Sequence, residues 1–418
     1  MFFCILQVVY LMAKLVLAYS GGLDTSVAIK WLQEKYGYEI ITLTLNVGQN
    51  EDMKFIEEKA YKIGSIKHYS IDAVEEFVEN YVNNAIKANA LYQGKYPLSS
   101  ALSRPLIAKY LVKIAEIENA EAVAHGCTGK GNDQVRFEAT IKALNPNLKI
   151  IAPVREWNLT RDEEIEYAKK NGIPLSVSKT KPYSIDQNIW GRSIEGGIIE
   201  DPFIEPPEDA FELTKSALDA PDKPAYLEIG FRNGIPIELN GEEMNEIELI
   251  KFLNEFGGMH GIGRIDHIED RLVGIKSREV YECPAALILI EAHKDLEKFV
   301  LTKLENEAKE YLDALWTKLV YNGLWEDPLR KDIEAFINST QIPRVTGKVK
   351  VKMYKGNMRI IGRKSEFALY DIKLSTYSSE SQFNQKNSEG FINIYSLQTV
   401  LAKKVEKINA RREERTKV

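Results

Sequence analysis

Short runs of β-branched or aliphatic residues alternate with helical patterns along the first part of the chain. The runs that predict strands cover residues 14–19, 39–46, 67–71, 122–125 and 149–152. Helical periodicity covers residues 24–36, 51–63, 73–85, 103–118 and 162–171. Strands separated by helices of this length predict βαβ units and a parallel sheet covered on both faces. We therefore expect a doubly wound α/β domain, a fold that binds ligands at the carboxyl ends of its strands.

The second half of the chain has a different pattern and predicts an α+β arrangement. Proline and acidic residues crowd residues 201–224, which indicates a surface excursion. Two predicted strands, 225–232 and 235–239, flank Asn233-Gly234, a pair that favours a two-residue hairpin turn. A second hairpin is expected over residues 345–361, around Lys355-Gly356-Asn357. Helices are expected at residues 246–256, 284–302, 306–320 and 397–412.

Composition narrows the class of protein. The 418 residues carry a net charge of −6, with 44% hydrophobic and 28% charged residues, as in ordinary globular proteins. This mild acidity argues against a nucleic-acid partner, which would need a basic surface. The three cysteines form no CxxC pair, so we expect a reducing, cytoplasmic compartment, no disulfide framework and no cysteine-based zinc site. The five histidines show no metal-ligand spacing, and no protein-held metal site is predicted.

Residues 1–12, MFFCILQVVYLM, are almost wholly apolar. A signal peptide or membrane anchor is disfavoured, because no basic residue precedes the run and the run is too short to span a bilayer. No small-residue cleavage site separates it from the first predicted strand. We interpret residues 1–12 as an N-terminal extension upstream of a start at Met12, with an ordered apolar arm as the alternative. No membrane partner is expected.

The most informative motif, AYSGGLDTS, joins the first predicted strand to the first helix. Gly21 and Gly22 allow a sharp turn that brings backbone amides close to a ligand. The helix start adds unpaired amides and a partial positive charge, which suit an anion of several phosphates. Asp24 can cap this helix or help position a phosphate-bound magnesium ion. The predicted phosphate site consists of Ala18, Tyr19, Ser20, Gly21, Gly22, Leu23, Asp24, Thr25 and Ser26.

The alternative for this motif is a Gly-Gly turn with an ordinary aspartate cap, which the hydroxyl-bearing flanks disfavour. It is not a Walker A loop, because GxxxxGK[ST] occurs nowhere in the chain. The motif resembles the PP-loop of the ATP pyrophosphatases. That resemblance implies a HUP-like domain that cleaves ATP between its α- and β-phosphates, with Ser20, Asp24 and Thr25 as catalytic candidates. It implies ATP with Mg²⁺ as a substrate complex, and no tightly bound cofactor.

A second glycine-rich segment, HGCTGKGNDQVRFE, covers residues 125–138 and follows a predicted strand. Its glycines free the backbone to wrap a ligand, while Thr128, Asn132 and Asp133 offer a hydroxyl, an amide and a carboxylate. Arg136 lies one helical turn beyond Asn132, on the same face. This set fits an amino acid, whose ammonium needs a carboxylate and whose carboxylates need polar donors and a guanidinium. A solvated polar loop capped by Asp133 is the alternative.

This segment and three further strings resemble the argininosuccinate synthase family, and the match runs from about Met12 to Tyr395. The further strings are YPLSSALSRP (96–105), KPYSIDQNIWGRSIEGG (181–197) and GIGRIDHIEDRLVGIKSREVYE (261–282). The family usually has Gly-Thr-Ser or Gly-Thr-Ala where this chain has Ser99-Ser100-Ala101, so the hydroxyl is kept as serine. The first string is also typical of a helix start, with Ser103 as cap and Pro105 in the first turn.

The resemblance implies roles for individual residues. Residues that would bind citrulline are Tyr96, Asn132, Arg136, Ser184, Ser193, Glu269 and Tyr281. Residues that would bind aspartate are Ser100, Thr128, Asn132 and Asp133. Gly126 would approach ATP, and for His125 an ATP contact and a structural role are equally favoured. A basic stretch is open between a solvated face and a pyrophosphate contact, and it comprises Arg264, Arg271, Lys276 and Arg278.

The resemblance also implies a domain organisation. Residues 13–178 would form the ATP-binding PP-loop domain and residues 179–375 an α+β synthetase and multimerisation domain. Residues 390–418 would form the C-terminal oligomerisation helix of a homotetramer. A solvated helix face is the alternative for this charged C-terminal segment.

The expected function is a ligation in arginine biosynthesis. The ureido oxygen of citrulline would attack the α-phosphorus of ATP, and the amine of aspartate would then displace AMP. No general base is obvious, and Asp24 and the carboxylates of aspartate itself are the candidates. One rival is a tRNA-modifying PP-loop enzyme, which the acidic balance disfavours. The other is a non-catalytic nucleotide-binding regulator, which has no need of the amino-acid-binding strings.

Overall fold

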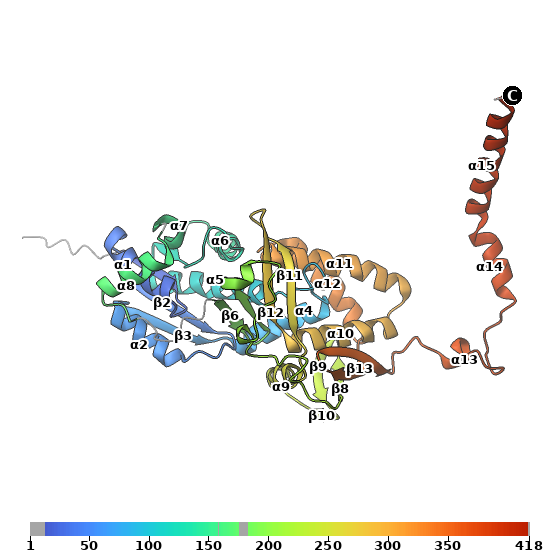
Figure 1. Cartoon of the computed structure of the whole chain (residues 1–418), viewed down its shortest axis with the longest axis horizontal. Coiled ribbons are helices and arrows are strands. Elements are labelled where there is room, and N and C mark those ends of the chain that lie inside the picture. The colour runs from blue at the N-terminus through green and yellow to red at the C-terminus, as the bar shows by residue number, and fades with distance from the viewer. Residues whose placement is uncertain (1–12, 158, 175–182, 417–418) are drawn as a thin grey trace, which may run out of the picture. The chain divides into compact units, whose positions relative to one another are not determined.

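Five parallel strands form the sheet of the N-terminal domain in the order β3-β2-β1-β4-β5 (Figure 1). The computed structural model describes residues 13–157, 159–174 and 183–416. The predicted extension 1–12 and the boundary at 178–179 therefore lie outside the described residues. The strands are β1 (Lys14–Ala18), β2 (Glu39–Asn46), β3 (Lys67–Asp72), β4 (Ala122–Ala124) and β5 (Lys149–Ile151).

Helices cover both faces of this sheet, as the sequence predicts. Alternate residues of a strand point to opposite faces. Leu15 and Leu17 accordingly join the core under α1 and α2, while Val16 joins the core under α5. The helices are α1 (Leu23–Tyr36), α2 (Met53–Ile63), α3 (Val74–Phe77), α4 (Asn83–Lys87), α5 (Ser99–Glu118), α6 (Asp133–Leu144), α7 (Pro153–Trp157) and α8 (Arg161–Lys170). A π-helical segment, Val78–Val82, joins α3 to α4.

Two predicted helix caps are wrong. Helix α5 begins at Ser99, because Leu98 adopts a left-handed conformation (φ 68°) that turns the chain directly into the helix. Ser103 therefore lies inside α5, where its hydroxyl donates to the carbonyl of Ser100 (3.1 Å). Helix α1 begins at Leu23 with Gly22 at the N-cap position and no side-chain cap. Asp24 consequently lies in the first turn of α1 and does not cap it.

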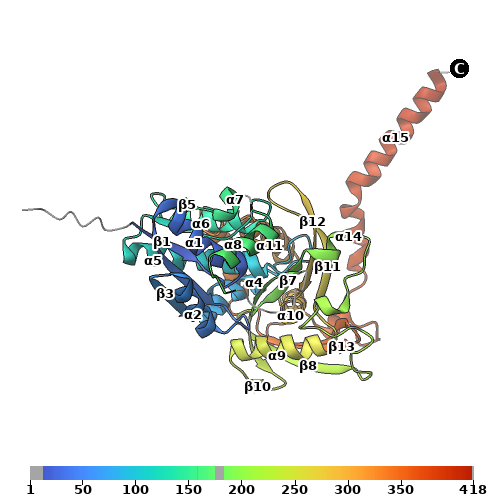
Figure 2. The same ribbon diagram turned by 60° about the vertical axis from the view of Figure 1, so that its left-hand side comes forward.

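The C-terminal part of the same compact unit contains two antiparallel sheets (Figure 2). The first, in the order β10-β9-β8-β13-β14, consists of β8 (Ala225–Arg232), β9 (Ile235–Leu239), β10 (Glu242–Glu243), β13 (Gly347–Tyr354) and β14 (Asn357–Lys364). Both predicted hairpins are confirmed. Their turns, Asn233-Gly234 and Lys355-Gly356, have positive φ at both positions, which a tight two-residue turn requires.

The second antiparallel sheet, in the order β11-β12-β7-β6, was not predicted as a sheet from periodicity. It comprises β6 (Ser184–Asn188), β7 (Gly191–Glu195), β11 (Arg264–Asp270) and β12 (Lys276–Glu282). Helices α9 (Glu246–Met259), α10 (Pro284–Val300), α11 (Lys303–Tyr321) and α12 (Pro328–Gln341) complete this part. The buried Lys309 of α11 donates to Asp313 (2.7 and 2.8 Å) and to the carbonyl of Lys87 after α4, so it ties the two parts together.

The residues from Ala368 onward form a second compact unit. It contains α13 (Ile372–Ser375), α14 (Asn387–Tyr395) and α15 (Leu397–Thr416). Along α15, Leu397, Leu401, Val405 and Ile408 are exposed in the single chain. Within the part of the chain that the structure describes, no helix combines the length and the apolar character that crossing a membrane requires.

Candidate functional site

The predicted phosphate loop and the glycine-rich segment meet at one point of the parallel sheet. Strand order reverses between β1 and β4, which are neighbours although β2 and β3 separate them in sequence. The phosphate loop follows β1 and the glycine loop, residues 125–132, follows β4. Ligands of doubly wound folds bind in the crevice at such a reversal, at the carboxyl ends of the strands. The fold therefore places both predicted segments where this architecture holds its ligand.

The phosphate loop turns at Gly21, whose φ of 77° is a conformation that glycine adopts without strain. The Ser20 hydroxyl lies 3.1 Å from the Thr25 hydroxyl and accepts from the backbone amide of Gly22 (3.3 Å). Lys59 of α2 is buried, and its ammonium donates to the carbonyl of Gly21 (2.6 Å). The loop therefore presents hydroxyls, backbone amides and a nearby cation, which suit a polyphosphate.

Asp24 faces α8 from the first turn of α1. Its carboxyl group hydrogen-bonds Glu164, which is 5% exposed. Burial, and next the charge of Asp24, raise the pKa of Glu164 to about 8. The two carboxyl groups consequently hold a proton between them at neutral pH, which allows them to lie side by side.

The glycine loop approaches the phosphate loop closely. A Cβ atom at Gly126 would lie 2.8 Å from Cγ2 of Thr25, so only glycine allows this approach. The buried His125 accepts from the amide of Cys127 through Nδ1 (3.3 Å) and pairs with Glu138 through Nε2 (3.3 Å). Both ring nitrogens are thus engaged within the protein, which supports the structural role for His125.

Ion pairs join three of the strings found in the sequence. The carboxylate of Asp133 accepts from Arg104 Nε (2.9 Å) and from Arg136 Nη1 (2.9 Å). Burial raises the pKa of Asp133, but the two guanidiniums outweigh it and hold this pKa at about 2. Arg104 also donates to Asp186 (2.7 Å), which accepts from the hydroxyl of Ser100 (2.5 Å). The predicted aspartate contacts Ser100 and Asp133 are therefore connected through Arg104.

The predicted citrulline contacts gather on the β11-β12-β7-β6 sheet. Tyr281 of β12 stacks on Tyr96, with ring centroids 4.3 Å apart, and its hydroxyl donates to Glu269 (2.8 Å). Glu269 is 2% exposed. Burial raises the pKa of Glu269, but hydrogen bonds from His267, Tyr321 and Tyr281 hold it below its usual value. A buried, charged carboxylate of this kind suits an ammonium ligand.

The remaining predicted residues are less enclosed. Ser193 is buried in β7, and its hydroxyl donates to the carbonyl of Asp186 (3.4 Å). Ser184, at the start of β6, and Thr128, in the glycine loop, are exposed. Arg271, from the basic stretch, donates to Glu279 (2.7 Å), Glu195 (2.9 Å) and the carbonyl of Lys130 (3.3 Å). This arginine holds the glycine loop against the second sheet.

Sequence reasoning missed four residues of this region. Arg104 and Asp186 lie within the strings themselves, where a charged residue beside a predicted contact was the available signal. Lys59 and Tyr321 lie outside the strings, and only the packing of α2 and α11 brings them to the site.

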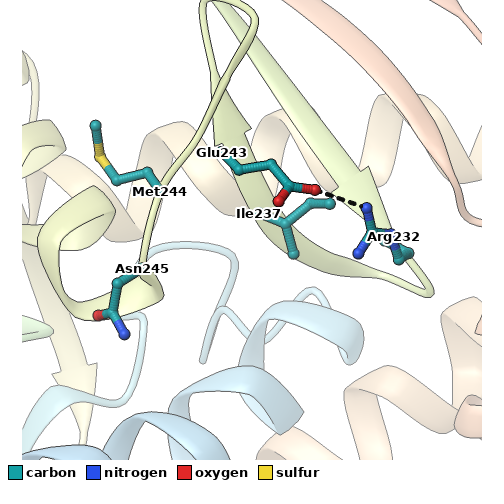
Figure 3. A pocket seen from close by; sticks show the side chains of 5 residues that line it. All are labelled: Arg232, Ile237, Glu243, Met244 and Asn245. Atoms are coloured by element: carbon teal, nitrogen blue, oxygen red, sulfur yellow. Dashed lines mark hydrogen bonds and ion pairs between the residues drawn. The ribbon is translucent and has the colours of Figure 1, made fainter.

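The pocket on the β8–β10 hairpin belongs to another part of the molecule (Figure 3). Its polar side chains are engaged with one another or with the backbone. Arg232 pairs with Glu243 (3.0 Å), and Asn245 accepts from the amide of Ile247 (2.9 Å). We assign no substrate to it.

A doubly wound domain with a phosphate loop at its strand reversal defines a nucleotide-binding protein of the α/β class. Residues 14–174 match the profile described as "Arginosuccinate synthase N-terminal HUP domain", and residues 183–402 match "Arginosuccinate synthase C-terminal domain". The chain belongs to the argininosuccinate synthase family. The predicted fold class and family are confirmed.

Curated relatives agree with the family profiles. Argininosuccinate synthase of Pyrococcus furiosus is 62% identical over 93% of this chain and 94% of its own length. The enzymes of Geobacillus sp. (strain WCH70) and Geobacillus thermodenitrificans are 59% and 58% identical, over 92% and 95% of this chain and 96% and 97% of their own lengths. The predicted class of activity, an ATP-dependent ligase that condenses citrulline with aspartate in arginine biosynthesis, is likewise confirmed.

Proposed function

We propose that the crevice between β1 and β4 carries out the ligation through a citrullyl adenylate, with the predicted residues in the predicted roles. The observation that carries the proposal is the contact between the two ATP-facing segments, Gly126 against Thr25, at the strand reversal. Residues 18–26 and Gly126 hold ATP, with its phosphates on the amides and hydroxyls of the phosphate loop.

The amino-acid groups follow from the charges around the crevice. Glu269 receives the α-ammonium of citrulline, while Tyr96, Arg136, Ser184, Ser193 and Tyr281 orient the rest of that molecule. Asp133 and Asn132 receive aspartate together with Ser100 and Thr128. The Arg104 and Arg136 guanidiniums keep Asp133 charged, so the site can hold an ammonium at neutral pH.

In the first step the ureido oxygen of citrulline attacks the α-phosphorus, and pyrophosphate leaves. In the second, the amine of aspartate attacks the ureido carbon, AMP leaves with its bonding electron pair, and the new nitrogen loses a proton. Such transfers depend mainly on positioning and on stabilisation of charge. The phosphate loop amides and the cation of Lys59 stabilise the leaving pyrophosphate. Asp24 is a candidate acceptor of the proton, because its carboxylate already shares one with Glu164.

Magnesium would arrive with the nucleotide. Mg²⁺ is commonly held by substrate phosphates and one or two carboxylates. Asp24 and the Ser20 hydroxyl fit that donor set, and the ion would neutralise charge on the phosphates. Among the residues that the structure describes, no cluster of three or more His, Cys, Asp or Glu is placed to hold a metal. This agrees with an ion held chiefly by its nucleotide.

The test of the activity is release of pyrophosphate from MgATP, with citrulline and aspartate supplied singly and together. Release only with both, in equal amount to AMP, is expected. Citrulline labelled with ¹⁸O in the ureido group should transfer its label to AMP, and label retained outside AMP contradicts the adenylate. Asp24→Ala should abolish release while the protein stays folded, since Asp24 caps no helix. Unchanged turnover in this variant would refute the phosphate-loop assignment.

We further propose a cytoplasmic homotetramer with domains at residues 13–178, 179–375 and 390–418. The support is the apolar stripe of α15, where Leu397, Leu401, Val405 and Ile408 recur at four, four and three residues. Light scattering should give a tetramer for the intact chain and a smaller species for L401E/V405E. Lys403→Glu, on the opposite face of α15, is the control and should stay tetrameric.

A further inference from the structure

Tyr321 is the last residue of α11, and its side chain is fully buried against the start of α6. Gly323 has φ 75°, and a Cβ there would lie 2.8 Å from Cα of Arg136, so the two segments are in close contact. Arg136 Nε donates to the carbonyl of Tyr321 (3.1 Å), and its guanidinium carbon lies 5.0 Å from the centroid of the phenol ring. The position of the phenol is therefore set by backbone packing.

The hydroxyl of Tyr321 bridges two predicted substrate contacts. It accepts from Asn132 Nδ2 (2.8 Å) and donates to Glu269 Oε1 (2.5 Å). The carbonyl of Asp270 lies 3.1 Å from it, but a phenol has one proton and a charged carboxylate is the stronger acceptor. The other end of the Asn132 amide, Oδ1, accepts from the backbone amide of Leu272 (2.8 Å). Both ends of the Asn132 side chain are thus oriented by the C-terminal part of the chain.

We propose that Tyr321 is a positioning residue for the ligation, whose hydroxyl fixes Asn132 and Glu269 together and so couples the aspartate side of the site to the citrulline side. The inference rests on the proposed function, in which Asn132 meets both amino acids and Glu269 meets the ammonium of citrulline. Tyr92 stacks on the Tyr321 ring at 3.4 Å between centroids, so one ring face is covered by protein.

The test compares Tyr321→Phe with Tyr92→Phe. The first change keeps the ring, the stack and the backbone hydrogen bond and removes only the bridging hydroxyl. The second removes the hydroxyl of the neighbouring ring, which donates to the carbonyl of Asp270 (3.0 Å). Loss of a hydrogen bond to a charged group predicts a rise of about tenfold or more in KM for citrulline in Y321F. KM for ATP should stay within about twofold of wild type, and Y92F should leave both values within the same limit.

A pH profile separates positioning from a purely structural role. Without the Tyr321 hydroxyl the pKa of Glu269 rises, so the acid limb of kcat/KM for citrulline should move to higher pH in Y321F and stay in place in Y92F. The groups that face Glu269 by hydrogen bond or charge are His267, Tyr281, Tyr321, Arg136, Glu279, Tyr92 and Tyr96. An unmoved acid limb together with equal KM values in the two variants overturns the proposal, even where both variants lower Tm.

Calorimetric titration with citrulline separates failure of this inference from failure of the proposed function. Wild-type protein that binds citrulline but releases no pyrophosphate with both amino acids contradicts the ligation alone. Equal citrulline Kd values for wild type and Y321F contradict the positioning role alone. A weaker Kd in Y321F, beside an unchanged Kd in Y92F, supports it.

Discussion

Gly126 lies against Thr25 so closely that a Cβ atom at position 126 would be 2.8 Å from the methyl carbon of the threonine. The glycine loop and the phosphate loop therefore fit together only while position 126 has no side chain. Because Thr25 lies one turn from the Gly21 bend, any shift of Thr25 alters the loop that faces the phosphates.

Gly126→Ala should impair ATP use while the protein remains folded. Overpacking of this kind costs about 1–3 kcal/mol, so KM for ATP should rise by about tenfold or more. Steady-state kinetics at saturating citrulline and aspartate measures it. Gly129→Ala is the matched control in the same loop, since its Cβ would meet only Arg155, at 3.7 Å. Equal KM values in the two variants would contradict a close fit at position 126.

Arg104 should be coupled energetically to Asp186. Arg104→Met leaves Asp186 without its 2.7 Å partner and leaves Asp133 with Arg136 alone, so KM for aspartate should rise at least about tenfold. In a double-mutant cycle with Asp186→Asn, the coupling in unfolding free energy should be about 1–3 kcal/mol. Denaturant titration of the four proteins measures it. The exposed pair Lys109–Glu76, also on α5, is the control, and K109M/E76Q should couple by less than about 1 kcal/mol.

Glu164→Gln should change how stability depends on pH. The folded pKa of Glu164, about 8, lies above its usual value, so the folded state holds a proton that the unfolded state releases between about pH 4.5 and 8. Stability of the wild type therefore falls as pH rises through this window. Glutamine removes that loss, so the gain from E164Q should be at least about 1 kcal/mol larger at pH 8 than at pH 5.

Thermal unfolding at the two pH values measures this difference. The exposed Glu166, on the same helix, is the control, and E166Q should change stability by less than about 0.5 kcal/mol at both. A gain from E164Q that is the same at pH 5 and pH 8 contradicts the shared proton.

Lys309→Met should destabilise the junction between the two parts of the large unit. Lys309 is 1% exposed and lies 2.9 Å from Glu297 as well as beside Asp313, so its loss leaves two buried carboxylates without a cation. The expected cost is about 3–5 kcal/mol in unfolding free energy. Lys303→Met, which removes an exposed pair with Glu307 on the same helix, should cost less than about 0.5 kcal/mol. Comparable losses in the two variants contradict a buried junction.

Local rules were sufficient where backbone chemistry decides the structure. The Asn233-Gly234 and Lys355-Gly356 turns and the first βα turn were predicted because positive φ and helix starts depend on a few neighbouring residues. Helix α12 was missed although Asp327 followed by Pro328 is a readable start, with the Asp327 carboxylate accepting from the amide of Leu329 (2.9 Å).

The β11-β12-β7-β6 sheet was missed for a different reason. Its buried positions include Ser193, Glu269 and Glu279, so the alternation that marks a half-buried strand is interrupted by the polar residues that build the site. The resemblance supplied Ser193 and Glu269 individually. The bridge through Tyr321 depends on α11 packing against α6, and no local sequence signal indicates that contact.

The hydrogen bonds from the C-terminal part to Lys130 and Asn132 have an evolutionary consequence. The phosphate loop and the strands that carry it come from residues 14–174, while the groups that orient the amino-acid contacts come from Arg271, Leu272 and Tyr321. Mutations at these C-terminal positions can change which acceptor is joined and leave the nucleotide chemistry intact. This separation allows an ancestral ATP-splitting domain to have gained new ligation products by exchanging the partner half appended to it.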